Sequence, residues 1–300
     1  MRLRAVSTAA VLLAALVISV PQAAASSAAA AGGGHAADFT GDGLPDVLAR
    51  ERGTGKLKVY PHSGTFNGTA TYPSVVTINL GWQSMRWIGA ADVTGDGFAD
   101  VVAIDSSWRM VVAVHSGVFN GTSTLRPGLV VVGYNWNVND VVSVFTNGGA
   151  HDSIIARRAS DGKLFTYANY EGLRGTDTFA APESFNPDGG DRSWSSEAFI
   201  GMAPVQGFDG PDDVVYITAN GELWYQSPRF HSKTLLGYGW SGVQQVVLTN
   251  LDDDNYPDII ARDRYSGNLL AYMNTSGPSG RTYVGPTVIG YGWQTNDIIA

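Results

Sequence analysis

The chain contains no cysteine. This absence excludes disulfide bonds, thiolate metal centres and cysteine nucleophiles. A chain of 300 residues can bury a large core without covalent cross-links. Long apolar runs are also missing after the N-terminus, and no segment beyond it shows helical periodicity. What is abundant, 37 Gly and 13 Pro with many Val, Ile, Tyr and Trp, indicates short strands joined by tight turns.

Basic residues are outnumbered, with 19 Lys and Arg against 27 Asp and Glu and a net charge of −8. Nucleic acid and anionic lipid both favour clusters of Lys and Arg. We therefore expect no nucleic-acid partner and no insertion into a membrane. Much of the acid falls in a few short loops, so the net charge reflects local sites as much as the whole surface.

The N-terminus has the pattern of a secretory signal peptide. Two arginines precede the apolar run 9–20, which is short for a membrane span, and a proline ends it. The alanines at 23–25 offer an A-x-A cleavage site. We predict a leader and small-residue linker over 1–31, cleaved near residue 25, and a secreted, extracellular protein. The alternative is an uncleaved membrane anchor.

Five tryptophans lie in matching sequence contexts, at Trp82, Trp136, Trp194, Trp240 and Trp293. Their separations are 54, 58, 46 and 53 residues. A period near 50 in a sequence rich in strand formers is typical of the blades of a β-propeller. The alternative is a set of five separate hairpin modules.

Each repeat has the same order of parts. An apolar strand such as 86–89 or 244–248 follows the tryptophan, and an acidic loop leads from it to a second strand. A turn that closes on Gly-x-Leu opens the third strand, and a fourth, such as 129–132, leads to the next tryptophan. Second strands are expected at 46–50, 100–104, 153–157, 213–217 and 258–262.

The two ends of the sequence complement each other. Residues 293–300 stop just after the apolar strand, whereas residues 36–38 begin at the acidic loop. In the second repeat the same two pieces are continuous over 87–92. We therefore predict an all-β fold, a single five-bladed propeller over 36–300 that is closed by pairing of the C-terminal strand with the N-terminal blade. Closure removes the free sheet edges that invite aggregation.

The acidic loops carry the clearest chemistry. The segment 38–46 recurs at 92–100 and, in a third version, at 250–258. Oxygen-bearing side chains stand at loop positions 1, 3, 5 and 9, and Gly or Asn stands at position 6, where a left-handed turn is expected. Calcium takes oxygen ligands from such loops, magnesium prefers rigid octahedral sites, and zinc and copper prefer His and Cys. The alternative is a set of metal-free Asp/Gly turns, but three carboxylates in one turn repel each other without a cation.

The pattern D-x-T-G-D-G-x-x-D-V before a short apolar strand resembles the FG-GAP/VCBS repeat family, which also builds the propellers of integrin α-subunits. The resemblance covers nearly all of the chain after the leader. It implies structural calcium at about three sites, and a secreted, adhesive or ligand-binding role. The ligands it implies are Asp38, Thr40, Asp42, Leu44 (carbonyl) and Asp46; Asp92, Thr94, Asp96, Phe98 (carbonyl) and Asp100; and Asn250, Asp252, Asp254, Tyr256 (carbonyl) and Asp258.

Two blades depart from this pattern. The segment 146–153 is short and nearly free of acids, and the segment 204–213 holds its acids out of register. We expect no calcium in either. Integrin propellers have seven blades, so neither blade number nor partner transfers from them. A five-bladed ring also resembles some lectins and glycosidases, in architecture alone.

No catalytic motif stands out. His62 and His115 are each followed by Ser in near-identical segments, which favours a duplicated strand connection over a nucleophile. G-x-S-x-G, H-E-x-x-H and phosphate-loop motifs are absent. A propeller glycosidase would need two carboxylates facing each other across the channel, and nothing selects a pair. The candidates outside the metal loops are Asp140, Glu171, Glu183, Glu197 and Asp297.

The sequence therefore predicts a monomeric binding or adhesion module, for a glycan or an extracellular protein, and not an enzyme. A propeller glycoside hydrolase or lyase is the alternative. The repeated tryptophans are interpreted as core residues, with sugar-stacking shelves as the other interpretation. Tyr134, Tyr238 and Tyr291 each stand two residues before such a tryptophan and share its face if the strand is regular. The sugar hypothesis depends on whether these rings are exposed.

Overall fold

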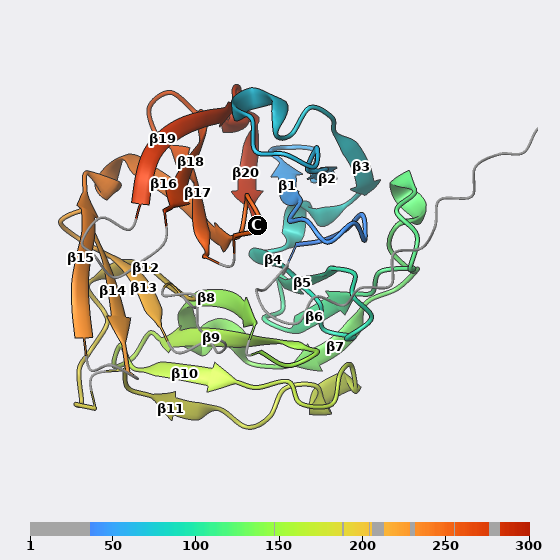
Figure 1. Cartoon of the computed structure of the whole chain (residues 1–300). Helices are drawn as coiled ribbons and strands as arrows, with labels where there is room; N and C mark the ends of the chain where they lie inside the picture. Colours follow the sequence, from blue (N-terminus) through green and yellow to red (C-terminus); the bar gives the residue numbers. More distant parts are fainter. Residues whose placement is uncertain are drawn as a thin grey trace, which may run out of the picture. The chain divides into compact units, whose positions relative to one another are not determined.

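The computed structural model describes residues 37–300 apart from 147, 188, 204, 206–212, 229–231, 255 and 276–282. The predicted leader over 1–31 and the turn residue Asn255 lie outside the described residues. Five four-stranded antiparallel sheets surround a central axis as blades (Figure 1), so the predicted five-bladed β-propeller is confirmed. Among the described residues there is no α-helix, and no helix long and apolar enough to cross a membrane.

In every blade the first strand lies near the axis and the fourth at the rim (Figure 1). Blade I consists of β20 (Asn296–Ile299), β1 (Val47–Glu51), β2 (Leu57–Tyr60) and β3 (Val76–Asn79). Blade II consists of β4 (Trp87–Ala91), β5 (Asp100–Ile104), β6 (Met110–Ala113) and β7 (Val130–Gly133). Blade III consists of β8 (Asn139–Thr146), β9 (Asp152–Arg158), β10 (Leu164–Tyr167) and β11 (Glu183–Phe185). Blade IV consists of β12 (Glu197–Met202), β13 (Val214–Thr218), β14 (Glu222–Ser227) and β15 (Ser232–Tyr238). Blade V consists of β16 (Val243–Thr249), β17 (Asp258–Asp263), β18 (Leu269–Asn274) and β19 (Tyr283–Gly290).

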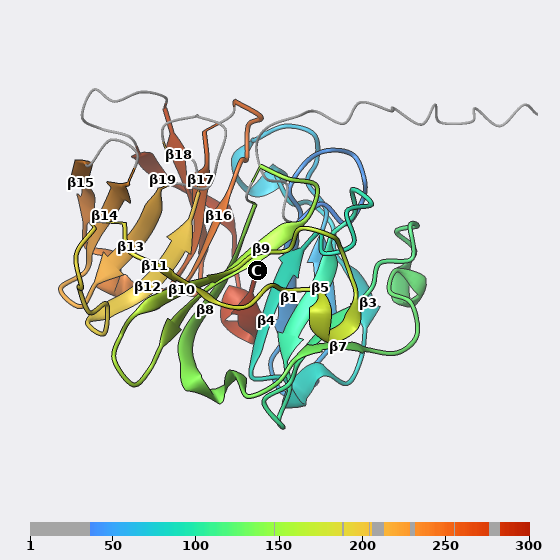
Figure 2. The ribbon, with the colours of Figure 1, turned by 90° about the horizontal axis from the view of Figure 1, so that it is seen from below.

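The connections between strands form two opposite faces of the ring, which Figure 2 views from the side. We call the loop face the one with the connections from first to second and from third to fourth strands. The turn face carries the other connections, from second to third strands and from one blade to the next. The 3-10 turns of the loop face are η1 (Gly68–Ala70), η3 (Gly121–Ser123) and η5 (Gly175–Asp177), and those of the turn face are η2 (Trp82–Ser84), η4 (Trp136–Val138), η6 (Trp240–Gly242) and η7 (Trp293–Thr295).

The two ends of the described chain close the ring. Strand β20 pairs antiparallel with β1, with Ile299 opposite Ala49 and Ile298 opposite Arg50. The N–H of Ala300 also donates to the carbonyl oxygen of Leu48 at 2.9 Å. The C-terminal strand thus completes the blade that the N-terminal segment begins, as predicted.

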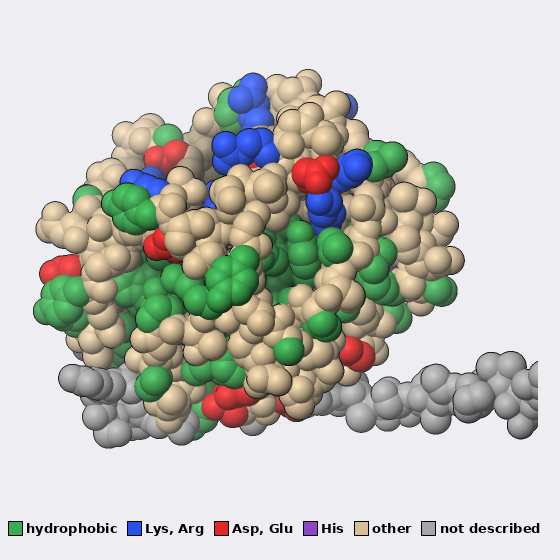
Figure 3. Space-filling model, turned by 90° about the horizontal axis from the view of Figure 1, so that it is seen from above, with side chains coloured by type: hydrophobic (Ala, Val, Ile, Leu, Met, Phe, Trp, Pro, Cys, Tyr) green, Lys and Arg blue, Asp and Glu red, His purple; other side chains and the backbone are tan. Residues whose placement is uncertain are grey.

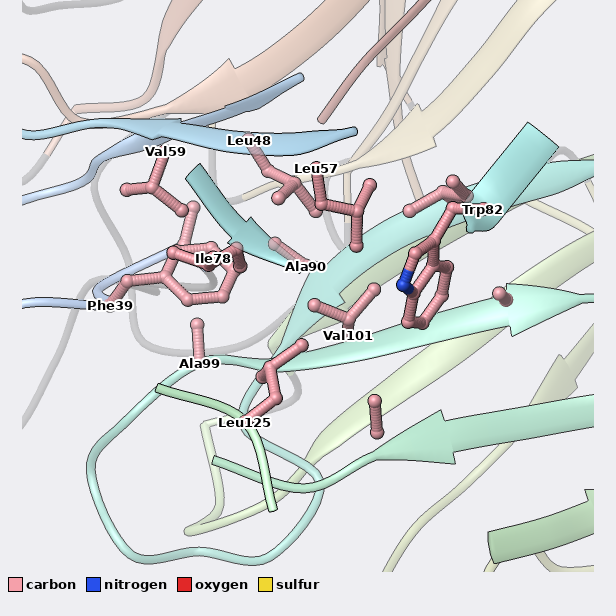
Figure 4. Packing of buried hydrophobic residues seen from close by; sticks show 14 of the residues in the cluster. Phe39, Leu48, Leu57, Val59, Ile78, Trp82, Ala90, Ala99, Val101 and Leu125 are labelled. Carbon is pink, nitrogen blue, oxygen red and sulfur yellow. The ribbon is translucent and has the colours of Figure 1, made fainter. Parts of the chain in front are cut away.

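The apolar core is divided into five clusters, one between each pair of neighbouring blades. Figure 4 shows the cluster in which Leu48 and Leu57 of blade I face Val101 of blade II. A second strand has a blade on either side, so both of its faces are covered. Strand β5 is accordingly buried along its whole length. This double burial explains why the second strands read as continuous apolar runs.

The repeated tryptophans seal these interblade clusters at the turn face. Trp136 packs its ring 4.8 Å from that of Tyr167, and Trp240 packs 4.5 Å from Tyr272. All five repeated tryptophans are at most 6% exposed. The core interpretation is therefore confirmed, and these indoles are not sugar-stacking shelves.

Three buried arginines connect neighbouring blades. Arg50 donates from Nε and Nη2 to the two carboxylate oxygens of Asp297 at 2.7 and 3.0 Å, and from Nη1 to the carbonyl of Trp82 at 2.9 Å. Arg157, at the same position of blade III, bonds likewise to Asp140 and to the carbonyl of Trp194. Arg262 of blade V bonds to the side-chain amide of Gln244 and to the carbonyl of Trp293. Each arginine thereby joins the inner strand of its own blade to the tryptophan turn that enters the next.

Candidate metal loops and ligand-binding surface

The three predicted calcium loops occupy equivalent places on the loop face. Segments 92–100 and 250–258 join the first and second strands of blades II and V, and segment 38–46 leads into the second strand of blade I. Loops of neighbouring blades touch, since the N–H of Ala99 donates to the carbonyl oxygen of Asp38 at 2.7 Å. The loops therefore belong to one continuous surface.

The last aspartate of each loop ties two distant parts of its blade together. Asp46 accepts the N–H of Phe39 on Oδ2 and that of His62 on Oδ1, both at 2.9 Å. Asp100 and Asp258 make the same two-sided contact. Each carboxylate joins the start of the loop to the end of the third strand, in blade V, or to the segment just after it, in blades I and II. In a chain without cysteine, these hydrogen bonds hold distant segments of the blade together where a disulfide could otherwise do so.

Within the described ranges, no basic side chain pairs with these buried carboxylates. Burial raises the pKa of Asp46 to about 7, of Asp100 to about 6 and of Asp258 to about 7; neighbouring loop acids also raise these pKa values, while backbone N–H donors lower them. In the described part of the chain, no Lys or Arg forms an ion pair with any of the three. A divalent cation would supply the missing charge.

Left-handed residues give the loops their tight curvature. The carboxylate of Asp38 accepts the N–H of Gly41 at 2.7 Å and of Gly43 at 2.8 Å. These glycines have φ values of +76° and +84°, and the second loop repeats both features. The left-handed turn predicted at position 6 is thus confirmed in two loops. Position 4, which the sequence reasoning missed, is left-handed as well, and in the third loop it is Asp253 with φ +62°.

The other predicted ligands lie nearby. Asp42 accepts the N–H of Leu44 at 3.0 Å, and Asp254 accepts that of Tyr256 at 2.9 Å. Burial, together with the charge of Asp254, raises the pKa of Asp252. The same position-5 contact joins Asp96 to Phe98, and the position-3 hydroxyls of Thr40 and Thr94 lie 3.4 and 3.5 Å from the carboxylates of Asp38 and Asp92.

No group of three Asp, Glu or His side chains among the described residues is arranged as a metal centre. The loop carboxylates accept backbone N–H groups of their own blade instead. Their donor chemistry fits calcium nevertheless, because every predicted ligand offers oxygen and because several acids crowd into each turn. When bound, the ion would supply positive charge at the loop, and the chain's own part is to hold oxygens at positions 1, 3, 5, 7 and 9.

The loop of blade III is built differently. Asp152 accepts the hydroxyl of Thr146 at 2.6 Å and the N–H of Asp92 at 2.7 Å, and burial raises its pKa to about 7. Its carboxylate therefore holds the neighbouring loop of blade II. The loop of blade IV, predicted over 204–213, lies mostly outside the described residues.

Comparison with known proteins bears on these loops. Residues 38–103 match the family model of the FG-GAP-like repeat. The resemblance seen in the loop sequence is confirmed over this segment. A solved lectin structure from Agrocybe aegerita, titled for its recognition of non-reducing terminal N-acetylglucosamine, is 18% identical with a TM-score of 0.41; the match covers 82% of this chain and 65% of that chain. No curated protein matches the chain.

The duplicated histidines organise the segments that follow the third strands of FG-GAP-like blades I and II. Nδ1 of His62 accepts the N–H of Gly64 at 3.1 Å, and Nδ1 of His115 accepts that of Gly117 at 3.0 Å. His115 also stacks on Phe98, with ring centroids 4.7 Å apart. These contacts agree with the predicted duplicated connection.

Four of the five acids considered for glycoside hydrolysis form ion pairs with arginines. Asp297 is held by Arg50, Asp140 by Arg157 at 2.8 Å, and Glu197 and Glu171 each form an ion pair with an arginine. Glu183 lies on the rim strand β11. None of these contacts brings two of the acids together across the channel.

The tyrosines that precede the tryptophans are exposed. Tyr134, Tyr238 and Tyr291 are 60%, 74% and 71% exposed. The residue between tyrosine and tryptophan is left-handed, as at Asn135 with φ +62° and Gly239 with φ +86°, and this turn breaks the alternation of the strand. The expectation of a shared face is therefore wrong, because the indole turns inward and the phenol outward.

Charge is divided between the two faces. In Figure 3 the Lys and Arg side chains gather toward the upper edge, which is the turn face. Among the described residues, the turn-face connections carry Arg52, Lys56, Arg86, Arg109, Lys163, Arg192 and Arg264 against Asp105, Asp161 and Asp191. Those of the loop face carry Asp38, Asp42, Asp46, Asp92, Asp96, Glu171, Asp177, Asp213, Asp252, Asp253 and Asp254 against Arg126 and Arg174.

Proposed function

We propose that this chain is a secreted binding module in which calcium stabilises three loops and the turn face binds carbohydrate. The repeated exposure of Tyr134, Tyr238 and Tyr291 carries the proposal. A phenol ring offers a flat apolar face to the C–H groups of a sugar and a hydroxyl to its oxygens. Equivalent rings on three blade junctions would let one glycan chain contact several sites and gain avidity.

The test of carbohydrate binding is a glycan array followed by calorimetry on the best ligand. Tyr238→Ala and Tyr291→Ala should each weaken binding, and the double variant should weaken it further. Tyr170→Ala is the matched control, since Tyr170 is 68% exposed but belongs to the loop face. Equal losses in the control and the turn-face variants, or no glycan bound at all, would contradict the proposal.

The acids of three loops support a structural role for calcium, as does the burial of Asp46, Asp100 and Asp258 with no basic partner in the described part of the chain. A ligand that binds only the folded state adds RT ln(1 + [L]/Kd), about 2.7 kcal/mol at a hundredfold excess over Kd. Calcium should therefore raise the melting temperature, and EDTA should lower it. An unchanged melt in EDTA together with no calcium by elemental analysis would reject this part of the proposal.

Export is proposed from the leader pattern over 1–31. Expression of the full gene product in a bacterial host should release a chain that begins near residue 26, which N-terminal sequencing of the medium would identify. Retention of the intact leader in the membrane fraction would instead support the uncleaved anchor.

A further inference from the structure

Trp108 occupies a position that glycine holds in the other four blades. A residue one or two positions before the third strand is left-handed at Gly55, Gly162, Gly221 and Gly267, with φ between +66° and +75°, and at Trp108 with φ +61°. In all five blades its carbonyl oxygen accepts the N–H of the next repeated tryptophan at 2.8–3.0 Å. A bulky side chain in this conformation is strained. Strain retained at a surface position points to a use for the side chain.

Arg86 is the neighbour of this indole. Its guanidinium carbon lies 4.1 Å from the ring centroid of Trp108. By strand register, Arg86 stands at the position that Asp297 holds in blade I and Asp140 holds in blade III. Those acids each hold a buried arginine. Blade II has Ile104 in place of that arginine. The residue at position 86 therefore has no buried arginine of its own blade to bind.

The cation and the ring are both accessible. Trp108 is 36% exposed, and Arg86 belongs to the exposed residues. Among the described residues no acid forms an ion pair with Arg86, whereas the adjacent Arg109 is held by Asp105 at 2.7 Å. Tyr134 lies two residues before Trp136, whose N–H donates to Trp108, so a second exposed ring belongs to the same blade junction.

The charges of the turn-face connections favour an anion at this place. Basic groups outnumber acids in the described connections of the turn face, while acids dominate those of the loop face. A polyanion is attracted to the first surface and repelled by the second. Exposed aromatic rings beside Arg86, which has no acidic partner among the described residues, add a place for the apolar face of a sugar.

We propose that Trp108 and Arg86 form a subsite for a negatively charged sugar, either carboxylated or sulfated. The face of the indole that Arg86 does not cover stacks on the sugar ring, and the guanidinium at the ring pairs with the carboxylate or sulfate oxygens. This inference rests on the proposed carbohydrate-binding function and names the class of sugar for one of its sites.

Calorimetry with pairs of ligands that differ only in charge tests this proposal. Tetragalacturonate is compared with its methyl ester, and a sulfated oligosaccharide with its desulfated form, at low salt with the protein loaded with calcium and free calcium removed. At least one charged ligand should bind several-fold more tightly than its uncharged partner, and the pair that differs tells carboxylate from sulfate. If neither pair differs, or neither charged ligand binds, the inference is overturned. Binding of an uncharged glycan that depends on Tyr238 would then leave the proposed function standing.

Variants locate the subsite. Arg86→Gln should weaken the charged ligand about two- to fivefold and leave its uncharged partner unchanged. Trp108→Gly restores the residue of the other blades, so the fold should be kept while both ligands bind about three- to tenfold more weakly. Arg52→Gln, which removes an exposed arginine from blade I, is the matched control. An equal loss in this control and in Arg86→Gln would show that only the charge of the face matters, and would overturn the assignment.

Discussion

The buried arginines that connect neighbouring blades allow a quantitative prediction. Replacing Arg50 by Ile, the residue that blades II and IV carry at this position, removes two hydrogen bonds to Asp297 and one each to the carbonyls of Trp82 and Met85. The side chain of Arg50 is 10% exposed and that of Asp297 is 31% exposed, so water replaces the lost donors only in part. Breaking a buried ion pair by removing one partner costs about 3–5 kcal/mol. The partial exposure of Asp297 sets our expectation at the lower end, about 3 kcal/mol.

Equilibrium denaturation in urea, followed by tryptophan fluorescence at saturating calcium, measures this loss. A change of about 3 kcal/mol corresponds to a fall in melting temperature of about 6–12 °C for a domain of this size. Arg158→Ile is the matched control, because its side chain is 40% exposed and its partner Asp161 lies at the surface. An exposed pair of this kind contributes little to stability, because water and salt screen it.

A double variant separates the charge from the packing. Adding Asp297→Asn to Arg50→Ile removes the unpaired carboxylate and should recover part of the stability. The reasoning is refuted if Arg50→Ile destabilises the protein no more than Arg158→Ile does. It is also refuted if the second substitution makes the loss larger.

Three further predictions follow from the loops and the core. Asp96→Asn should lower the calcium content by one ion per chain in elemental analysis while the other two sites stay filled; an unchanged content would contradict its role as a ligand. Trp240→Ala should cost about 3–5 kcal/mol of unfolding free energy, because a large buried ring is lost; a loss under 1 kcal/mol in urea would contradict its place in the core. Gly41→Ala should lower the melting temperature more than Gly64→Ala, since both glycines have positive φ but only a Cβ at Gly41 would collide with Phe98; equal shifts would show that the collision is relieved at no cost.

Much of the fold could be predicted because each blade repeats the same order of strands and loops within one short segment of the chain. A second strand lies between two blades, so its residues must be apolar on both faces, and segments such as 100–104 stand out. The match between the two chain ends predicted the pairing of β20 with β1, because blade I would lack an inner strand if β20 did not pair there.

The loops were predictable in position but not in their internal contacts. The alternating acids of 38–46 marked the place, because oxygen at positions 1, 3, 5 and 9 is a local pattern. The sequence could not indicate that Asp46 also accepts the N–H of His62. That contact joins residues far apart in the chain, and it exists only once the third strand of the blade is in place.

The sequence by itself determined the strand order, the period of the blades and the sites at which acids gather, because these depend on neighbours within a few residues. Tertiary structure decided which aromatic rings are exposed: a single left-handed residue such as Asn135 turns Tyr134 outward and Trp136 inward. It also decided the partners of the arginines. Arg50 binds Asp297 at a blade interface, whereas Arg86 lies over Trp108, and the residues beside each arginine in the sequence do not indicate this difference. Such differences arise from register between strands, which brings distant residues together and has no local signal in the chain.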